Sequence, residues 1–228
     1  MAKQGKRLRD GRAEIDREKA YPLDEAITLV KQGATAKFDE TVEIALRLGI
    51  DPKQTSQAVR GAYSLPHGTG KKLRVIAFCE GEDAQAAIAA GAIEAAGEEL
   101  AKKIDGGWLD FDVAIAHPGM MRFVGKLGRV LGPQGKMPSP KSGTVTADIG
   151  NAVREFVAGK IEFRNDAGAT IHAPVGRRSF SKEQLAENIH AFIEHVKTLR
   201  PPGTKGLFIR KAFIKSTMSP SVTVQVSA

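Results

Sequence analysis

The chain has 228 residues, which suffices for one large domain or two modest ones. Its 42% hydrophobic and 26% charged residues favour a packed core over disorder. The net charge of +8 favours a polyanionic partner such as nucleic acid. No apolar run is long enough to span a bilayer, no signal-like stretch follows the basic start, and the single cysteine, Cys79, is expected to be a buried, inert thiol. We therefore expect a cytoplasmic protein without a membrane segment.

The positive charge is concentrated at the two ends of the chain. Residues 1–67 carry 12 basic and 10 acidic residues, residues 68–158 carry 11 of each, and residues 159–228 carry 11 and 5. The cuts fall at turn-like sequence, the Pro/Gly-rich residues 66–70 and Gly159. A neutral middle between basic ends predicts a discontinuous domain, 1–67 with 159–228, that carries 68–158 as an inserted domain.

The first part of the chain predicts an arm, a helix and a strand. Residues 1–20 are highly charged and are expected to form a loose arm or a frayed helix. Pro22 suits the first turn of a helix, with an apolar face following it. Residues 41–48 alternate apolar and polar side chains, which predicts a strand with one buried and one solvated face.

In the middle part of the chain, expected strands alternate with expected helices. Residues 73–79 and 111–116 are continuous apolar runs, typical of strands covered on both faces. Helices are expected from Asp83, over 97–104 and over 151–157. Strands that alternate with helices predict an α/β layer fold.

The last part returns to strands around one long helix. Residues 160–165 and 170–175 flank Asp166-Ala167-Gly168, which predicts a β-hairpin. Ser181 and Gln184 have the spacing of a capping box, so a helix should begin there. The apolar stripe of this helix consists of Leu185, Ile189, Phe192 and Val196, and residues 201–203 should end it. Two final strands are expected over 207–214 and 222–226.

Signatures of catalysis are missing from the sequence. The five histidines and Cys79 do not form a zinc-like cluster. Gly68-Thr69-Gly70-Lys71 lacks the earlier glycine of a phosphate loop and is followed by Lys72 instead of Ser or Thr. No G-x-G-x-x-G follows residues 73–79, and there is no G-x-S-x-G. We expect that the protein is not an enzyme and that it binds neither a metal nor a cofactor. Two alternatives remain open: a nucleotide-dependent enzyme that uses the middle domain, and a protein–protein adaptor.

Two segments suit contact with nucleic acid. Residues 131–146 form a glycine- and proline-rich loop whose backbone N–H groups, with Lys136 and Lys141, could face phosphate. The alternative is a rigid structural loop with solvated lysines. Residues 215–220 combine a lysine, hydroxyls and a methionine, which suit ribose and phosphate, although an ordinary turn between strands explains them equally well.

Several motifs together resemble one family. Residues 38–43 (FDETVE), the loop 132–146, residues 162–166 (EFRND), Glu187-Asn188 and residues 216–218 (STM) occur in the order found in the L-one ribosomal proteins of the bacterial large subunit. The resemblance covers essentially the whole chain. It implies a discontinuous, split α+β sandwich domain with an inserted Rossmann-like, three-layer α/β domain, in agreement with the charge pattern.

The resemblance also implies a function. The split domain would bind a folded segment of large-subunit ribosomal RNA and form the mobile stalk beside the exit-site tRNA, aiding release of deacylated tRNA. The protein would also repress translation by binding its own operon mRNA. It would be a monomer when free from the ribosome and would need no cofactor.

The motifs carry over a set of RNA-contact residues. They are Phe38, Thr41, Glu43, Arg164, Asp166, His172, Ser179, Ser216, Thr217, Met218 and Ser219. Phe38 could stack on a ribose or belong to the core, and Glu43 could accept from RNA or orient Arg47 or another basic residue. The chain departs from the family at three positions: Ser219 replaces a common glycine, Ser139 a common asparagine, and Ala167 a residue that is often basic. These departures put in doubt a close backbone approach at Ser219 and one phosphate contact at Ala167.

Overall fold

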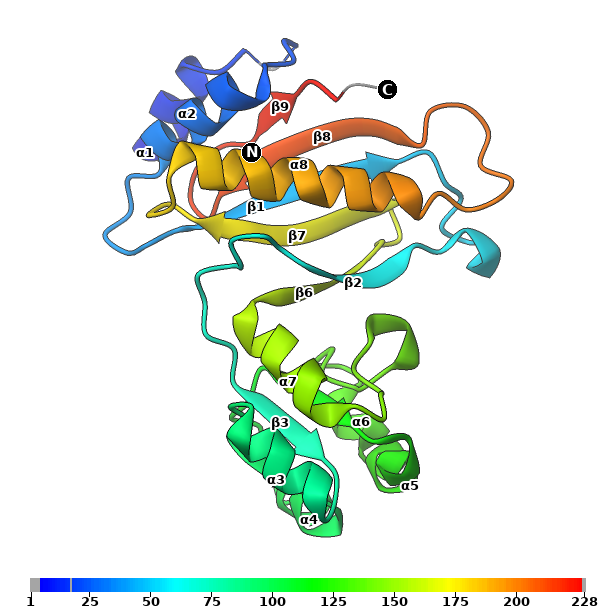
Figure 1. Ribbon diagram of the computed structural model, residues 1–228. Coiled ribbons are helices and arrows are strands. Elements are labelled where there is room, and N and C mark those ends of the chain that lie inside the picture. The colour runs from blue at the N-terminus through cyan, green and yellow to red at the C-terminus, as the bar shows by residue number, and fades with distance from the viewer. Residues whose placement is uncertain (1–4, 17, 227–228) are drawn as a thin grey trace. The chain divides into compact units, whose positions relative to one another are not determined.

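The computed structural model describes residues 5–16 and 18–226, and it divides into two compact units (Figure 1). The first unit comprises Met1–Gly70 and Ile161–Ala228, and the second comprises Lys71–Lys160. The division falls beside the turn-like segments at which the charge pattern changes. Helices and strands are mixed throughout the chain, as the sequence predicts. Residues 1–4 of the expected arm lie outside the described residues.

The first unit is built on a four-stranded antiparallel sheet in the order β7-β1-β8-β9. Its strands are β1 (Thr41–Leu48), β7 (Thr170–Arg177), β8 (Ile209–Ser216) and β9 (Val222–Val224). Its helices are α1 (Lys6–Ala13), α2 (Leu23–Gly33), α8 (Lys182–Thr198) and the 3-10 turn η1 (Thr55–Gln57). Helices therefore precede and separate the strands that pair in this sheet.

One face of this sheet is buried and the other is open. Val42, Ile44 and Leu46 of β1 are buried in a single core with side chains of α2 and α8, which confirms the predicted alternation. Burial of each such side chain contributes about 1.5–3 kcal/mol relative to exposure. The intervening β1 side chains are half-buried or exposed on the opposite face. The sheet thus offers a solvated surface bordered by strand ends.

Helix α8 begins where the sequence predicts. The Ser181 hydroxyl accepts from the Gln184 backbone N–H at 3.2 Å, and the Gln184 side-chain oxygen Oε1 accepts from the Ser181 N–H at 3.0 Å, so the capping box is confirmed. The apolar stripe from Leu185 to Val196 is buried in the core. The helix is thereby fixed at its start and along its length.

The predicted hairpin between residues 160–165 and 170–175 is wrong. Strand β6 (Lys160–Arg164) pairs with β2 (Arg60–Ser64) in a separate two-stranded sheet, and a single bridge, Asn165 to Ile171, links it to β7. Asn165 explains the diversion, because its backbone N–H donates to Val59 O at 3.0 Å and its side-chain oxygen accepts from the Val59 N–H at 2.8 Å. The turn at Asp166 exists, but it connects two sheets.

The chain leaves the first unit through a clamp centred on Asn188. This wholly buried side chain donates to Gly68 O at 3.0 Å and to Val175 O at 2.8 Å, and it accepts from the His67 N–H at 3.0 Å. The neighbouring Glu187 carboxylate lies 2.5 Å from His67 Nε2. The Glu187-Asn188 motif therefore fixes the segment that leads to the second unit.

The second unit contains a three-stranded parallel sheet in the order β4-β3-β5. Its strands are β3 (Val75–Phe78), β4 (Glu94–Ala96) and β5 (Val113–Ala116). Its helices are α3 (Glu82–Ala89), α4 (Glu98–Asp105), α5 (Met121–Val124), α6 (Gly128–Leu131) and α7 (Ile149–Ala158), with 3-10 turns η2 (Pro118–Met120), η3 (Gly125–Leu127) and η4 (Pro140–Ser142). The sequence did not predict β4 or the helices between 118 and 131, whose glycines and short lengths weaken the periodic signal.

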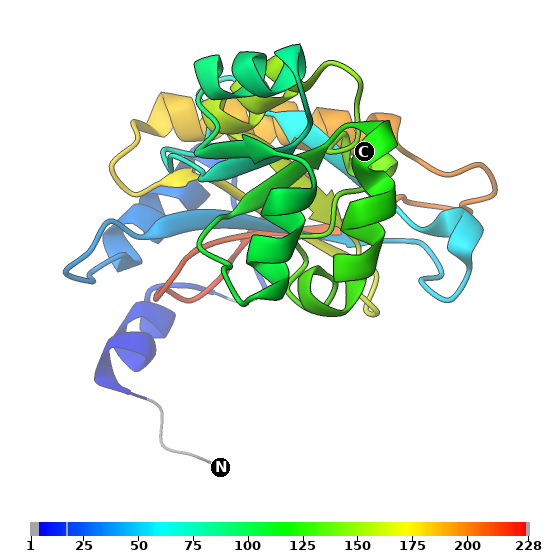
Figure 2. The same ribbon diagram turned by 90° about the horizontal axis from the view of Figure 1, so that it is seen from below.

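Helices cover both faces of this sheet (Figures 1 and 2). Ile76 and Phe78 pack in a cluster with side chains of α4 to α6, whereas Val75 and Ala77 pack with α3 and α7. The continuous apolar run is thereby explained, because both sides of the strand are buried. Cys79 lies at the end of this run, and burial, followed by the nearby Asp83 charge, raises the pKa of its thiol to about 11. It is a poor nucleophile at neutral pH.

Within residues 5–16 and 18–226, no helix is both long and apolar enough to cross a membrane. The same described residues contain no group of three or more His, Cys, Asp and Glu side chains that could hold a metal ion.

Candidate nucleic-acid interface

Three segments meet at one end of the four-stranded sheet. They are the loop 36–40 before β1, the connection 178–181 after β7, and the turn 217–221 between β8 and β9. The strand register brings them together, since Thr41 lies opposite Arg177 and Val42 opposite Ser216. The Thr217 N–H also donates to Thr41 O at 3.1 Å. Residues far apart in the sequence thus form one continuous edge.

The Glu40 carboxylate joins two of these segments. One oxygen accepts from the Ala36 N–H at 2.9 Å; the other accepts from the Ser216 hydroxyl at 2.7 Å and the Met218 N–H at 2.9 Å. The Glu40 side chain is wholly buried. Burial acts to raise its pKa, but the hydrogen bonds from Ala36, Ser216 and Met218 outweigh it, so the pKa lies below the ordinary value. The buried charge therefore fixes the shape of the turn.

Asp39 joins the third segment to the same loop. Its carboxylate accepts from the Ser179 N–H at 3.1 Å and from the Ser179 hydroxyl at 2.8 Å. The Arg177 guanidinium donates to Asp39 O at 2.9 Å. Asp39 and Glu40 were missed as functional residues, although they stand in the FDETVE motif. The available signal was two adjacent carboxylates immediately before a half-buried strand.

The hydrogen bonds of Asp39 and Glu40 leave exposed the side chains that are suited to contact with a ligand. Phe38 is 53% exposed and Met218 is 43% exposed, so the core interpretation of Phe38 is wrong. Thr217 is exposed, and its hydroxyl oxygen accepts from the Thr41 N–H at 3.2 Å. Large apolar groups held in water beside a rigid backbone are typical of interaction sites.

Three predicted contact residues use their hydroxyl groups in hydrogen bonds within this edge. Ser216 is wholly buried and its hydroxyl donates to Glu40, so its side chain is withdrawn from direct contact. The Ser219 hydroxyl accepts from the Ser216 N–H at 2.9 Å and donates to Pro220 O at 3.1 Å. The hydroxyl that replaces the common glycine is therefore satisfied within the turn. Ser179 is exposed, but its hydroxyl is likewise engaged by Asp39.

The open face of the sheet is predominantly basic. Arg47 lies opposite Lys211 and Thr170, and Glu43 lies opposite Lys215. The Glu43 carboxylate is 3.4 Å from Lys215 Nζ, so the basic partner of Glu43 is Lys215. Side chains opposite one another project from the same face of a sheet. These paired positions therefore place Arg47, Lys211 and Lys215 on the face beside one carboxylate that is already paired.

The remaining predicted residues lie beyond the middle of β1, where His172 is opposite Ala45. Asp166 Oδ1 accepts from the Gly168 and Thr170 N–H groups, each at 2.8 Å, and Asp166 Oδ2 is 3.8 Å from His172 Nε2. The Thr170 hydrogen bond is the main cause that lowers the pKa of Asp166. Arg164 is exposed at the end of β6. The candidate residues thus form two groups, linked by the open face, because Thr41 and Arg47 are at opposite ends of β1.

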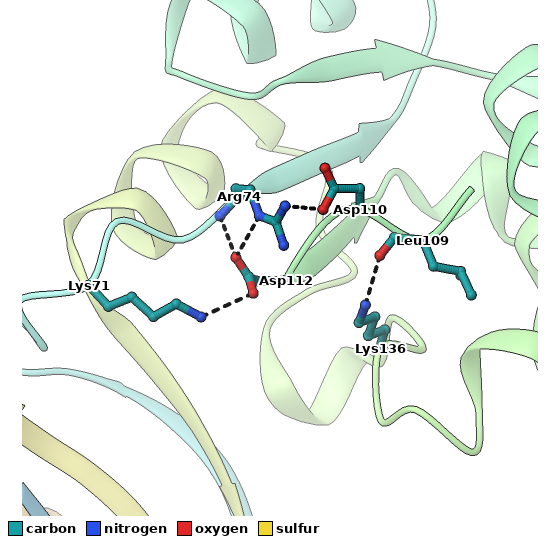
Figure 3. A network of polar contacts seen from close by, with 6 residues as sticks. All are labelled: Lys71, Arg74, Leu109, Asp110, Asp112 and Lys136. Atoms are coloured by element: carbon teal, nitrogen blue, oxygen red, sulfur yellow. Dashed lines mark hydrogen bonds and ion pairs between the residues drawn. The ribbon is translucent and has the colours of Figure 1, made fainter. Parts of the chain in front are cut away.

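In the proline-rich loop, Lys136 has a structural role. Its Nζ donates to Leu109 O at 3.0 Å (Figure 3). The same atom lies 4.9 Å from the centre of the Phe111 ring. The loop is further fixed by the Ser139 N–H, which donates to the Thr144 hydroxyl at 2.8 Å. Lys141 is exposed. Lys136 therefore has the structural role of the rigid-loop alternative, and the phosphate interpretation keeps Lys141 and the backbone N–H groups of the loop.

A second network in the same unit joins its entry segment to β5. The Asp112 carboxylate accepts from Lys71 Nζ at 3.1 Å and from the Arg74 N–H at 3.0 Å, and Arg74 also pairs with Asp110 (Figure 3). Burial acts to raise the pKa of Asp112, but these hydrogen bonds lower it overall. The network is a structural tie at the start of the second unit.

Comparison with known proteins identifies the family to which the chain belongs. Residues 30–220 match the model of the Ribosomal protein L1p/L10e family. The chain is 52% identical over 225 residues to the Large ribosomal subunit protein uL1 of Thermus thermophilus, a match that covers 98% of each chain. It is 49% identical over 222 residues to the protein of that name from Kosmotoga olearia, covering 97% of this chain and 96% of the relative. The chain belongs to the L1 family of ribosomal proteins, which are structural proteins and not enzymes.

Proposed function

We propose that this chain is a protein of the large ribosomal subunit in the cytoplasm and that its first unit binds a folded segment of ribosomal RNA. The observation that carries the proposal is the exposed group of Phe38, Thr217 and Met218, held by the buried Glu40 carboxylate beside a basic sheet face. Family membership supports the same ligand.

The chemistry of the edge suits folded RNA. Phe38 and Met218 can pack on ribose or an unstacked base, and the Thr217 hydroxyl oxygen can accept a further hydrogen bond from a 2′-OH. Arg47, Lys211 and other cations of the open face supply phosphate contacts, which makes binding salt-dependent. The backbone at this edge is fixed before binding, so little ordering free energy is spent on association.

The resemblance extends the proposal to finer roles. We propose that the bound RNA forms the mobile stalk beside the exit-site tRNA and that the protein aids release of deacylated tRNA. The same edge would bind a similar structure in the protein's own operon mRNA and repress its translation. In this scheme the second unit, 71–160, is a Rossmann-like insertion, and the protein is a monomer when free.

The nucleotide-enzyme alternative is disfavoured at the start of α4, on the sheet edge where such a ligand would bind. A Cβ placed on Gly97, which precedes α4, would lie 2.3 Å from Glu80 Oε1. The carboxylate of Glu80 therefore occupies the space at the start of α4, and its charge would repel a phosphate there. Micromolar binding of a common nucleotide in calorimetry would revive this alternative.

Recovery and sequencing of RNA that copurifies with the protein tests the proposal. We expect enrichment of one structured segment of large-subunit ribosomal RNA and of the operon mRNA. Enrichment should persist when residues 71–160 are replaced by a short linker, because β2 and β6 pair at the point where the chain enters and leaves the first unit. A folded variant that recovers RNA without enrichment would refute the assignment to the first unit.

A further inference from the structure

The second unit is nearly neutral as a whole, yet its charges are strongly segregated along the chain. Residues 113–147 carry five basic residues and no acidic residue, whereas the rest of residues 71–160 carries seven basic and eleven acidic residues. A neutral total thus conceals a positively charged segment. That segment contains α5, η3 and α6 and the proline-rich loop.

The helical turns of this segment place three of the cations on one face. Helix α5, the 3-10 turn Gly125–Leu127 and α6 follow one another without a break. Buried apolar residues recur at Val124, Leu127 and Leu131. Exposed cations recur at i, i+4 and i+7, the spacing of a single helix face. These cations, Arg122, Lys126 and Arg129, are named here the cationic stripe.

The surroundings of the cationic stripe allow a polyanion to approach closely. Apart from their chain neighbours and the backbone of the same helix, no heavy atom lies within 4 Å of a Cβ placed on Gly125 or Gly128. Arg122 and Lys126 lie 4.6 and 6.0 Å from the centre of the half-buried Phe123 ring. Glu98 is bridged to Lys102 at 3.0 Å, which is the main cause that lowers its pKa, and the nearby charges of Lys126 and Arg122 lower that pKa further.

We propose that the cationic stripe is a second RNA-contact surface, which binds the sugar–phosphate backbone without reading base sequence. Seven residues of helix extend about 10 Å, enough to face roughly three phosphates of one strand. Two of the three cations are arginines, whose planar guanidinium groups bind phosphate in a bidentate manner. The open glycines admit the backbone, and Phe123 offers an apolar surface to a ribose.

The proposal shares its ligand class with the proposed function but places it on residues outside the first unit. The test therefore uses the full chain and a short RNA duplex of unrelated sequence, which does not depend on recognition by the Thr217–Met218 turn. The test variant combines Arg122→Gln, Lys126→Gln and Arg129→Gln. The matched control combines Lys71→Gln, Lys103→Gln and Lys160→Gln, which removes the same charge from lysines paired with Asp112, Glu94 and Glu155.

The salt dependence of duplex binding is the readout. Loss of three phosphate contacts should reduce the slope of log K against log salt by about 2–3, and the control should change it by less than about 1. A test variant with the wild-type slope would overturn the proposal and leave the stripe for an acidic protein. An equal fall in both variants would also overturn it, because only net charge would then matter. Circular dichroism verifies that both variants fold.

A second readout leaves the cations intact. Gln134→Cys places a thiol in the exposed turn after α6, and the native Cys79 is 1% exposed, so an environment-sensitive maleimide labels position 134 selectively. Addition of duplex RNA should change the fluorescence of this label with the same affinity as measured by binding. Unchanged fluorescence at saturating RNA would contradict RNA contact at the stripe.

Discussion

The Ser216 hydroxyl donates a 2.7 Å hydrogen bond to the Glu40 carboxylate, and both side chains are wholly buried. The bond joins the loop before β1 to the turn after β8 across 176 residues of sequence. A buried carboxylate persists only when its hydrogen bonds compensate for lost hydration. Here the compensation comes from the Ala36 N–H, the Ser216 hydroxyl and the Met218 N–H, and the last of these belongs to the backbone that presents the Met218 side chain.

Replacing Glu40 should destabilise the first unit. In Glu40→Gln the amide NH₂ faces groups that donate hydrogen bonds to the carboxylate in the wild type, so these bonds are lost. We therefore expect the free energy of unfolding, measured by urea denaturation, to fall by about 2–3 kcal/mol. The matched control is Glu43→Gln, which breaks a partly exposed pair with Lys215 and should cost less than about 1 kcal/mol. Equal losses in the two variants would contradict the framing role of Glu40.

The lowered pKa of Glu40 predicts the direction in which stability changes when the pH falls. A carboxylate whose folded pKa is below its unfolded pKa stabilises the fold fully above the unfolded value, near 4.5, and this contribution is lost as pH falls through the folded pKa. The stability difference between wild type and Glu40→Gln should therefore be constant above about pH 5 and shrink below it. A difference that grows on acidification would show that the sign is wrong.

Much of the first unit could be predicted from sequence, because its signals are local. The alternation in β1 and the capping box of α8 each depend on neighbouring residues, and both are confirmed. The hairpin failed because the partner of β6 is β2, about 100 residues earlier, and local turn chemistry at Asp166 cannot reveal that choice. Strand β4 was missed because three residues give too short a pattern.

In the candidate site, too, local features could be predicted from sequence and contacts between remote residues could not. Exposed Thr217 and Met218 were expected from composition, and the structure brings them together with Phe38 at one edge. Burial of Ser216 could not be foreseen, since a serine at a strand end is usually solvated. Its partner, Glu40, is remote in sequence, and only the paired strands reveal the contact.

The Asn188 clamp predicts a local effect. Asn188→Ala would leave the His67 N–H and two carbonyl oxygens without their buried partner, so we expect a loss of about 2–4 kcal/mol in the free energy of unfolding. Hydrogen exchange of the His67 amide should also accelerate. The control Asn151→Ala removes an exposed amide and should change stability by less than about 0.5 kcal/mol. Wild-type exchange at His67 in the Asn188 variant would refute the clamp.

The central claim is that the Thr217–Met218 turn contacts folded ribosomal RNA. A filter-binding titration of the stalk segment of large-subunit RNA tests it most directly, with wild type compared against Thr217→Val combined with Met218→Ala. The control combines Thr55→Val with Leu207→Ala, an exposed hydroxyl and a 64% exposed apolar side chain elsewhere in the first unit. We predict at least a tenfold loss of affinity, about 1.4 kcal/mol, for the turn variant and less than threefold for the control. Equal affinity of the turn variant and wild type would contradict the account.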